Sequence, residues 1–345
     1  MSTMNDVQPH APHPVYRGPV IDAHAHFDAG TVREAESVLG APDLPDRLLN
    51  FWDLTWPPPA FDAWQATWAR QRADGMSLLH MPDISGVGRP GFADAVVAGI
   101  AQARALGAVG VKMWKNLGLH LHDADGALLT VDDRRLDPLW AAAAEHGLPV
   151  AIHIGDPPAF FAPLDEDNER LGELRRRPEY WFGDRTRFPP LAEVQAAFER
   201  VVARHPATTF VGLHFGCFMP LESVARMLEQ YPNYCVDTAT RTFDLGREGF
   251  RDAALEIFAR WPDRIIFGTD LIRTGVYDLP DTRGTEQDPA AYYQHHWLFF
   301  ETTDELAAPF AFLPETWVLR GLGLDENQLR ALYYDNARRV FGLPA

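Results

Sequence analysis

Residues 20–27, VIDAHAHF, form a short apolar run that ends in two histidines one residue apart. Alternate side chains of a β-strand point to the same face, so His24 and His26 share one face while Ala25 points to the other. Two imidazoles in this arrangement can bind a single metal ion. The same HxH spacing recurs in LHLHD at 119–123, so the spacing alone does not identify a metal-binding pair.

Similar short apolar runs recur along the chain, and longer segments with helical periodicity separate them. Alternation of this kind predicts an α/β protein whose parallel strands are joined by helices. One predicted helix covers residues 133–146, where Leu136, Leu139 and Trp140 lie on one face and Gly147 ends it. Another covers 190–205. The predicted strands are 18–26, 47–53, 76–83, 108–114, 148–156, 208–216, 233–239 and 264–270.

Eight strand–helix repeats predict a closed (β/α)8 TIM barrel, with its active site at the carboxyl ends of the strands. We expect one domain over residues 1–345, with a flexible N-terminal tail at 1–17. An open doubly wound sheet is the alternative, but no Gly-rich dinucleotide loop follows the first strand. Two long loops are expected at the active-site end, at 155–190 after the fifth strand and 271–300 after the eighth.

Further potential metal ligands stand at the ends of other predicted strands. Lys112 ends the fourth strand, His153 the fifth, His214 the sixth and Asp270 the eighth. A barrel brings strand ends together, and imidazole nitrogen with carboxylate oxygen suits zinc or manganese. We therefore predict one or two divalent ions, with zinc favoured, bound by His24, His26, Lys112, His153, His214 and Asp270.

Lys112 is the unusual member of this set, because an ammonium group beside a divalent cation is repelled. Either carbon dioxide carboxylates it to a carbamate that bridges two ions, or it stays charged and binds an anionic substrate. The second HxH pair, His120 and His122, follows Gly118 and lies beyond its strand. We expect those two histidines to be solvated or packed against other side chains.

Substrate contacts are expected from residues that follow the strands. Arg241 and Arg273 can bind a carboxylate, and Trp52 and Trp114 are aromatic residues near the predicted mouth. Surface salt bridges and core packing are the alternatives for these four residues. Three other histidines have simpler expected roles: a core position for His80, and a lid or surface position for His295 and His296.

Composition narrows the class of partner. The formal net charge of −17 disfavours nucleic acid and anionic membranes, so a small-molecule substrate is expected. Two cysteines exclude a disulfide scaffold, although one bridge remains open, and they favour a cytoplasmic location. No apolar run approaches the roughly 20 residues that span a bilayer. Association into a homo-oligomer is left open.

Taken together, these motifs resemble the amidohydrolase superfamily, and in particular its amidohydrolase-2 branch. The resemblance rests on HxH in the first strand, VKMW at 111–114, the histidines after the fifth and sixth strands, FGTD at 267–270 and the closing segment LRALYYDNARRVFGL at 329–343. It covers nearly the whole chain and implies a metal-dependent barrel enzyme.

The resemblance implies one of two ligand schemes. In members with two ions, the counterparts of His24, His26 and Asp270 hold the first ion and those of His153 and His214 the second, with a carboxylated counterpart of Lys112 between them. In members with one ion, the counterparts of His24, His26, His153 and Asp270 hold it. His214 then corresponds to a catalytic base or polarising group.

The expected function is metal-dependent hydrolysis of an amide, ester or lactone carbonyl in a small cyclic or carboxylate-bearing substrate. Asp270 and His214 are the expected catalytic residues. The alternative is a nonoxidative decarboxylase of the aminocarboxymuconate-semialdehyde decarboxylase type. Several such relatives replace the first histidine of HxH with glutamate, and this chain keeps His24. A noncatalytic barrel is disfavoured, because every expected ligand is present.

Overall fold

A computed structural model describes residues 16–27, 47–50, 76–217, 220–273, 289–310, 312–314 and 316–344. Each of the eight predicted strand segments contains a strand of one parallel sheet, which runs in the order β8-β7-β6-β5-β4-β3-β2-β1-β9. The chain is an α/β TIM barrel, as predicted. Its strands are β1(Ile21–Phe27), β2(Arg47–Asn50), β3(Ser77–His80), β4(Gly110–Met113), β5(Val150–Ile152), β6(Phe210–Gly212), β7(Tyr234–Asp237), β8(Ile265–Ile266) and β9(Leu271–Arg273).

One segment, residues 265–273, joins the two edges of this sheet. β8 at its start pairs with β7, and β9 at its end pairs with β1. Between them, the Ala23 amide donates to the Phe267 carbonyl at 3.0 Å, and the Asp270 amide donates to the His24 carbonyl at 2.6 Å. The first and last strands are thereby connected, which is the connection that a barrel requires.

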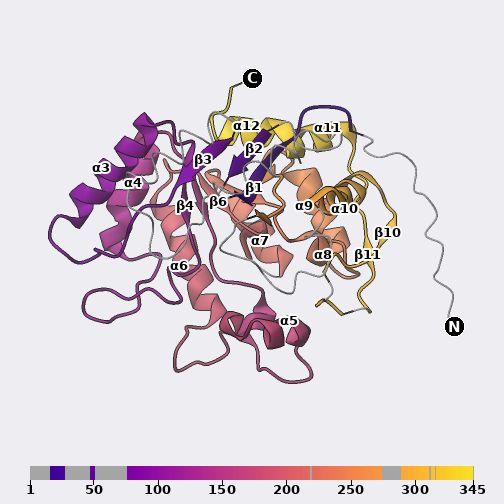
Figure 1. The fold of residues 1–345 in the computed structure, drawn as a ribbon, viewed down its shortest axis with the longest axis horizontal. Helices are drawn as coiled ribbons and strands as arrows, with labels where there is room; N and C mark the ends of the chain where they lie inside the picture. The colour runs from indigo at the N-terminus through magenta and orange to yellow at the C-terminus, as the bar shows by residue number, and fades with distance from the viewer. Residues whose placement is uncertain are drawn as a thin grey trace.

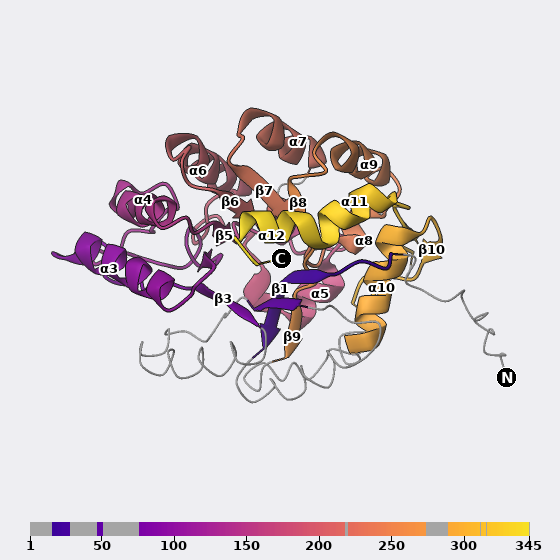
Figure 2. The ribbon, with the colours of Figure 1, turned by 90° about the horizontal axis from the view of Figure 1, so that it is seen from above.

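Helices surround the strands, as Figures 1 and 2 show. The prediction for 133–146 is confirmed by the 3-10 turn η1(Arg134–Leu136) followed by α4, and that for 190–205 by α6, which buries Val194, Phe198 and Val201. The outer helices are α3(Phe92–Ala105), α4(Asp137–Glu145), α6(Leu191–Arg204), α7(Leu221–Gln230) and α9(Arg251–Arg260).

The closing helical segment packs against the strands at one end. It consists of α11(Glu326–Arg330), the π-helical turn η6(Ala331–Asp335) and α12(Asn336–Val340). Ala337 and Phe341 belong to the same buried cluster as Ile21, the first residue of β1. The Asn336 side chain donates to the Ile265 carbonyl at 2.7 Å, which fixes this segment to β8. Figure 1 shows α11 and α12 on the opposite side of the strands from α5(Leu171–Arg176).

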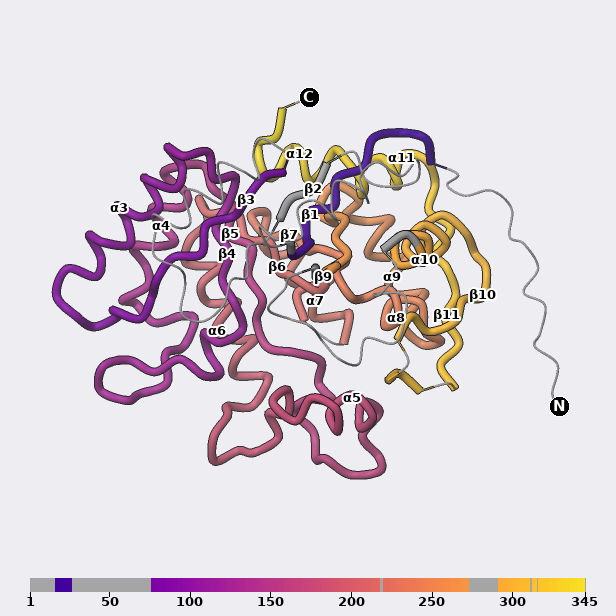
Figure 3. The backbone as a smooth tube through the Cα atoms, viewed as in Figure 1, coloured from indigo at the N-terminus to yellow at the C-terminus, as the bar shows by residue number. Residues whose placement is uncertain are grey.

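The segment at 155–190 contains short helices rather than a plain loop. These are the 3-10 turn η2(Pro158–Phe161), α5 and the 3-10 turn η3(Pro178–Tyr180). Figure 3 shows the part carrying α5 extending beyond the strands. Arg170, only 2% exposed, holds the segment to the barrel through an ion pair of 2.8 Å with Asp244 of α8(Thr242–Leu245).

The second expected loop, 271–300, is largely regular where the structure describes it. It starts with β9 and ends in α10(Pro289–Glu301), and the prediction of a loop there is wrong for these two parts. His295 and His296 are buried in α10, so the surface interpretation is wrong for them. The His295 Nε2 and Thr242 Oγ1 atoms lie 3.0 Å apart. The strands β10(Glu305–Leu306) and β11(Leu319–Arg320) follow as a small antiparallel pair.

Three simpler expectations can be compared with the structure. Cys217, in the 3-10 turn η4(Phe215–Cys217), and Cys235 are both free and buried, so the open question of one disulfide is answered. Of the predicted tail at 1–17 the structure describes only the last two residues. Tyr16 is buried, and its amide donates to Glu301 at 3.0 Å. Within the described part of the chain, none of the helices combines the length and apolarity needed to cross a membrane.

Candidate metal centre

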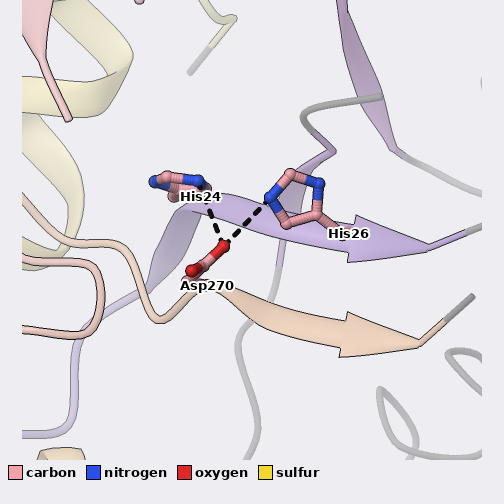
Figure 4. Close-up of side chains that lie close together, drawn as sticks. All are labelled: His24, His26 and Asp270. Carbon is pink, nitrogen blue, oxygen red and sulfur yellow. Dashed lines mark ion pairs between the residues drawn. The ribbon is translucent and has the colours of Figure 1, made fainter. Parts of the chain in front are cut away.

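His24, His26 and Asp270 converge at the junction of β1 and β9. The Asp270 Oδ1 atom lies 3.3 Å from His24 Nε2 and 3.0 Å from His26 Nε2. One ligand atom from each residue lies within 4.8 Å of the others. Figure 4 shows the carboxylate between the two imidazoles, which stand on the same strand. The common face predicted for the HxH pair is therefore present, and it is directed at Asp270.

The backbone that carries Asp270 is held by a buried carboxylate. Asp22 accepts hydrogen bonds from Tyr293 Oη at 2.6 Å and from Thr269 Oγ1 at 2.5 Å, and also from the Thr269 amide. Asp270 itself has φ +63°, which is uncommon for a residue other than glycine. Such strain persists where the surrounding structure fixes it, and it is frequent at functional sites.

Glycine is required at 268, in the FGTD motif. A Cβ atom there would lie 2.7 Å from the Cβ of His24, which is closer than any real contact. The absence of a side chain lets the segment before Asp270 approach β1 closely. The FGTD motif therefore supplies the potential ligand Asp270 and also the glycine that lets the backbone before Asp270 pass close to β1.

The other predicted ligands lie beside this group. The ring centroid of His214 is 4.9 Å from that of His24 and 4.3 Å from that of His153. Lys112 is 1% exposed in β4, and its charge contributes to lowering the pKa of both His24 and His153. The structure thus brings ligand atoms of His24, His26 and Asp270 within reach of one ion and places the rings of His214 and His153 beside them.

Three of the histidines have one ring nitrogen hydrogen-bonded to an oxygen atom of the protein. His24 Nδ1 lies 2.6 Å from Asp237 Oδ2, and His153 Nε2 lies 3.3 Å from Asp156 Oδ1. His214 Nδ1 lies 3.1 Å from the Ala239 carbonyl. Carboxylate and carbonyl oxygens only accept hydrogen bonds, so each of these nitrogens carries the proton. This arrangement is typical of metal-binding histidines, whose second nitrogen then has a lone pair for the ion.

The charge states also suit a cation. Burial lowers the pKa of His24, His153 and His214, so these imidazoles are neutral at neutral pH. Burial alone would raise the pKa of Asp270, but the neighbouring imidazoles outweigh it and lower that pKa below its usual range. Neutral imidazoles and an ionised carboxylate are the forms that bind zinc or manganese, so the donor set fits such an ion.

The four predicted substrate residues differ in what the structure says of them. Arg241 is buried, so the surface salt bridge is excluded: its Nε donates to the His214 carbonyl at 2.9 Å and its Nη1 to Asp244 at 2.8 Å. Trp114 directly follows β4 and is partly exposed. The backbone of Arg273 belongs to β9, but its side chain lies outside the described residues, as does the whole of Trp52.

The second HxH pair lies in the loop after β4, as predicted. The ring of His120 packs against Phe182 and Phe188, with centroids 5.8 and 5.3 Å away. His122 Nδ1 lies 2.9 Å from the His120 carbonyl. His80 is buried, and its Nε2 approaches Gly99 of α3, so it belongs to the strand–helix core.

Three buried charged residues near the centre were not predicted as site residues. Asp22 accepts the backbone amide of His24 at 3.0 Å, Asp156 Oδ1 lies 3.3 Å from His153 Nε2, and Lys115 donates to Asp156 at 2.7 Å. A carboxylate inside the apolar run at 18–26 was a usable signal for Asp22. The other two have ordinary positions in the sequence, and their role is visible only from the contact between them.

A known family and several solved structures resemble this chain. A family model described as amidohydrolase matches residues 6–343. Among curated proteins no sequence matches the chain. Solved structures do. A putative amidohydrolase from Staphylococcus aureus has a TM-score of 0.57 at 14% identity, with 94% of this chain and 100% of that chain covered.

Two further solved structures have named activities. A probable 2-pyrone-4,6-dicarboxylic acid hydrolase from Acinetobacter baumannii has a TM-score of 0.53 at 12% identity, covering 94% of this chain and 100% of its own. A 2,6-dihydroxybenzoate decarboxylase from Rhizobium has a TM-score of 0.51 at 16% identity, covering 95% and 99%. At these identities the likeness establishes the barrel fold alone, whereas the family model spans almost the entire sequence. The chain belongs to the amidohydrolase-2 family.

Proposed function

We propose that the protein is a metal-dependent hydrolase that acts on the amide, ester or lactone carbonyl of a small substrate. The observation that carries this proposal is the convergence of His24, His26 and Asp270, with His214 and His153 beside them. A divalent ion held there would act as a Lewis acid that polarises the carbonyl and lowers the pKa of water. Zinc suits the nitrogen-rich donor set best.

Asp270 is the proposed proton acceptor. Its carboxylate is ionised, and the strained backbone and the Asp22 network hold it in place. From this position it can take a proton from the attacking water and return it to the leaving group. His214 is the proposed second group. Its Nδ1 is engaged by the Ala239 carbonyl, so its neutral Nε2 can accept a proton or bind an ion.

The number of ions depends on Lys112. The close contact between the His153 and His214 rings, with centroids 4.3 Å apart, supports a second ion beside the first. In that arrangement a carboxylated Lys112 would supply the negative bridge between the two. With a single ion, Lys112 would not need to be carboxylated. Its ammonium group would then remain available to bind an anionic substrate.

A decarboxylase is the alternative. A structurally similar relative is named as a 2,6-dihydroxybenzoate decarboxylase and another as a 5-carboxyvanillate decarboxylase. Either chemistry would be carried out by the same proposed metal centre. We favour hydrolysis because His24 retains the first position of HxH, where several decarboxylases of the family have glutamate.

Elemental analysis and product analysis test the proposal together. We expect one or two equivalents of zinc or manganese per chain, loss of activity on chelation, and its return on adding the metal. Substrates should include lactones, amides, esters and aromatic acids, in water enriched in oxygen-18. Incorporation of the label into a product carboxylate supports hydrolysis, and release of carbon dioxide without it supports the decarboxylase. A folded protein that binds no stoichiometric metal would contradict both.

A further inference from the structure

A line of three buried polar side chains runs from the loop after β4 to the metal centre. Lys115 Nζ lies 2.7 Å from Asp156 Oδ2, and the other oxygen of the same carboxylate lies 3.3 Å from His153 Nε2. Lys115 is 7% exposed, Asp156 5% and His153 8%. The proposed chemistry uses His153 as a ligand or neighbour of the ion and gives the other two residues no part.

The two oxygens of Asp156 have different partners, and this fixes the direction of each bond. The ammonium group of Lys115 can only donate, so Oδ2 accepts from it. Oδ1 then accepts from His153, which places the proton on Nε2 of that ring. The lone pair of His153 is therefore on Nδ1, the nitrogen that Asp156 does not contact.

Lys115 is itself held from a second side. Its Nζ lies 4.0 Å from the centre of the Tyr180 ring, in η3 of the 155–190 segment. A cation over the face of an aromatic ring is stabilised electrostatically, and more so when it is removed from water. Lys115, from the loop after β4, is thus held by two residues of the 155–190 segment, Asp156 at its start and Tyr180 in η3.

We propose that Asp156, clamped by Lys115, is a positioning residue that fixes the Nε2–H tautomer of His153 and directs its Nδ1 lone pair toward the metal centre. The importance of this position for metal binding rests on the proposed function, whereas the tautomer itself does not. Partners of this kind usually change metal affinity by about 10- to 100-fold when they are removed.

Four variants separate positioning from simple structural support. Asp156→Asn preserves the shape but offers an amide that can donate to His153, and Lys115→Met removes the clamp. Lys115→Arg keeps the charge and serves as the conservative rescue. Asp167→Asn is the matched control, because Asp167 is exposed on the same segment. Circular dichroism and thermal unfolding establish which variants are folded.

Two measurements are needed, and the first requires no metal. Nitrogen-15 NMR of histidine side chains in metal-free protein, assigned with His153→Gln, is expected to show His153 protonated on Nε2. In Asp156→Asn and Lys115→Met that signal should move toward the Nδ1–H form or a mixture of both. An Nδ1–H ring in the wild type, or an unchanged signal in folded Asp156→Asn, would overturn the proposal.

The second measurement is zinc affinity, by competition with a chromophoric chelator. We expect a loss of about 10- to 100-fold for Asp156→Asn and Lys115→Met, near-complete recovery in Lys115→Arg and no change in Asp167→Asn. Wild-type affinity in folded Asp156→Asn would count against the positioning role. If the wild type binds neither zinc nor manganese, the proposed function fails, while the NMR result still decides whether Asp156 sets the tautomer.

Discussion

Asp237 holds two histidines of the metal centre with one carboxylate. Its Oδ2 lies 2.6 Å from His24 Nδ1, and its Oδ1 accepts the backbone amide of His214 at 2.6 Å. All three residues are buried, and burial raises the pKa of Asp237. One side chain at the end of β7 therefore sets both the ring orientation of a β1 residue and the backbone position after β6.

Asp237→Asn is expected to weaken metal binding without abolishing it. The amide can present its NH2 group to His24 Nδ1, which would favour the tautomer that protonates Nε2 and lose the lone pair facing Asp270. We expect about 10- to 100-fold lower zinc affinity, measured by chelator competition. The exposed Asp263→Asn should bind zinc as the wild type does. Equal affinities in the two variants would show that Asp237 does not orient His24.

The two HxH pairs make opposite predictions when one histidine of each is replaced. His26→Asn should lower bound metal by at least one equivalent per chain and reduce turnover by about 100-fold or more, because it removes a converging ligand. His122→Asn should retain metal and turnover, because His122 is exposed in the loop after β4, where its Nδ1 lies 2.9 Å from the His120 carbonyl. Elemental analysis of both purified variants checks this. Loss of metal in His122→Asn would contradict the assignment of metal binding to His24 and His26 alone among the two HxH pairs.

The ion pair between Arg170 and Asp244 predicts an acid-dependent loss of stability. Burial alone would raise the pKa of Asp244, but Arg170 and Arg241 outweigh it, and the pKa falls below the usual 3.8. A carboxyl whose pKa is lower in the folded state contributes stability above pH 3.8 and loses it as the pH falls through the folded value. At pH 7 the free energy of unfolding of Asp244→Asn should therefore be about 3–5 kcal/mol lower than that of the wild type.

The difference in free energy of unfolding between Asp244→Asn and the wild type should narrow as the pH falls below 3.8 toward the lower pKa of the folded carboxyl. Urea unfolding of the wild type and the variant at pH 7, 5 and 3 measures this difference. Glu169→Gln is a suitable control, because Glu169 also forms an ion pair, with Arg247, but its side chain is 48% exposed. A difference for Asp244→Asn that does not vary with pH would mean that packing, not charge, accounts for the loss.

Both cysteines should resist thiol reagents in the folded protein. Burial raises the pKa of the Cys217 thiol to about 12 and that of Cys235 to about 11, so almost no thiolate is present at pH 8. A chromogenic disulfide reagent is expected to modify neither residue within minutes under native conditions and both in guanidinium chloride. Rapid native modification of Cys217 would show that the region around η4 opens readily.

Features set by local sequence were predicted well. The strands and the helices α4 and α6 depend on apolar periodicity and on Gly147 or proline at their ends, which a single segment contains. The gathering of His24, His153, His214 and Asp270 followed from one rule, that parallel strands of a barrel end at the same face.

Features set by distant partners were missed. The role of Asp22 depends on Thr269 and Tyr293, and that of Asp156 on Lys115, and no periodicity connects residues so far apart. The segment 271–300 looked irregular because β9 is short and pairs with a strand from the other end of the chain. Burial of His295 in α10 likewise depends on Thr242, which lies in α8.

Residues 265–273 join the first and last strands and also deliver Asp270. A partly folded chain in which β9 has not reached β1 consequently lacks the third ligand as well as its last strand pairing. An ion bound as proposed would need all three ligands, which only the completed ring offers, and by mass action it would favour that ring over every incomplete form. Binding of the proposed cofactor and closure of the barrel would then be one event.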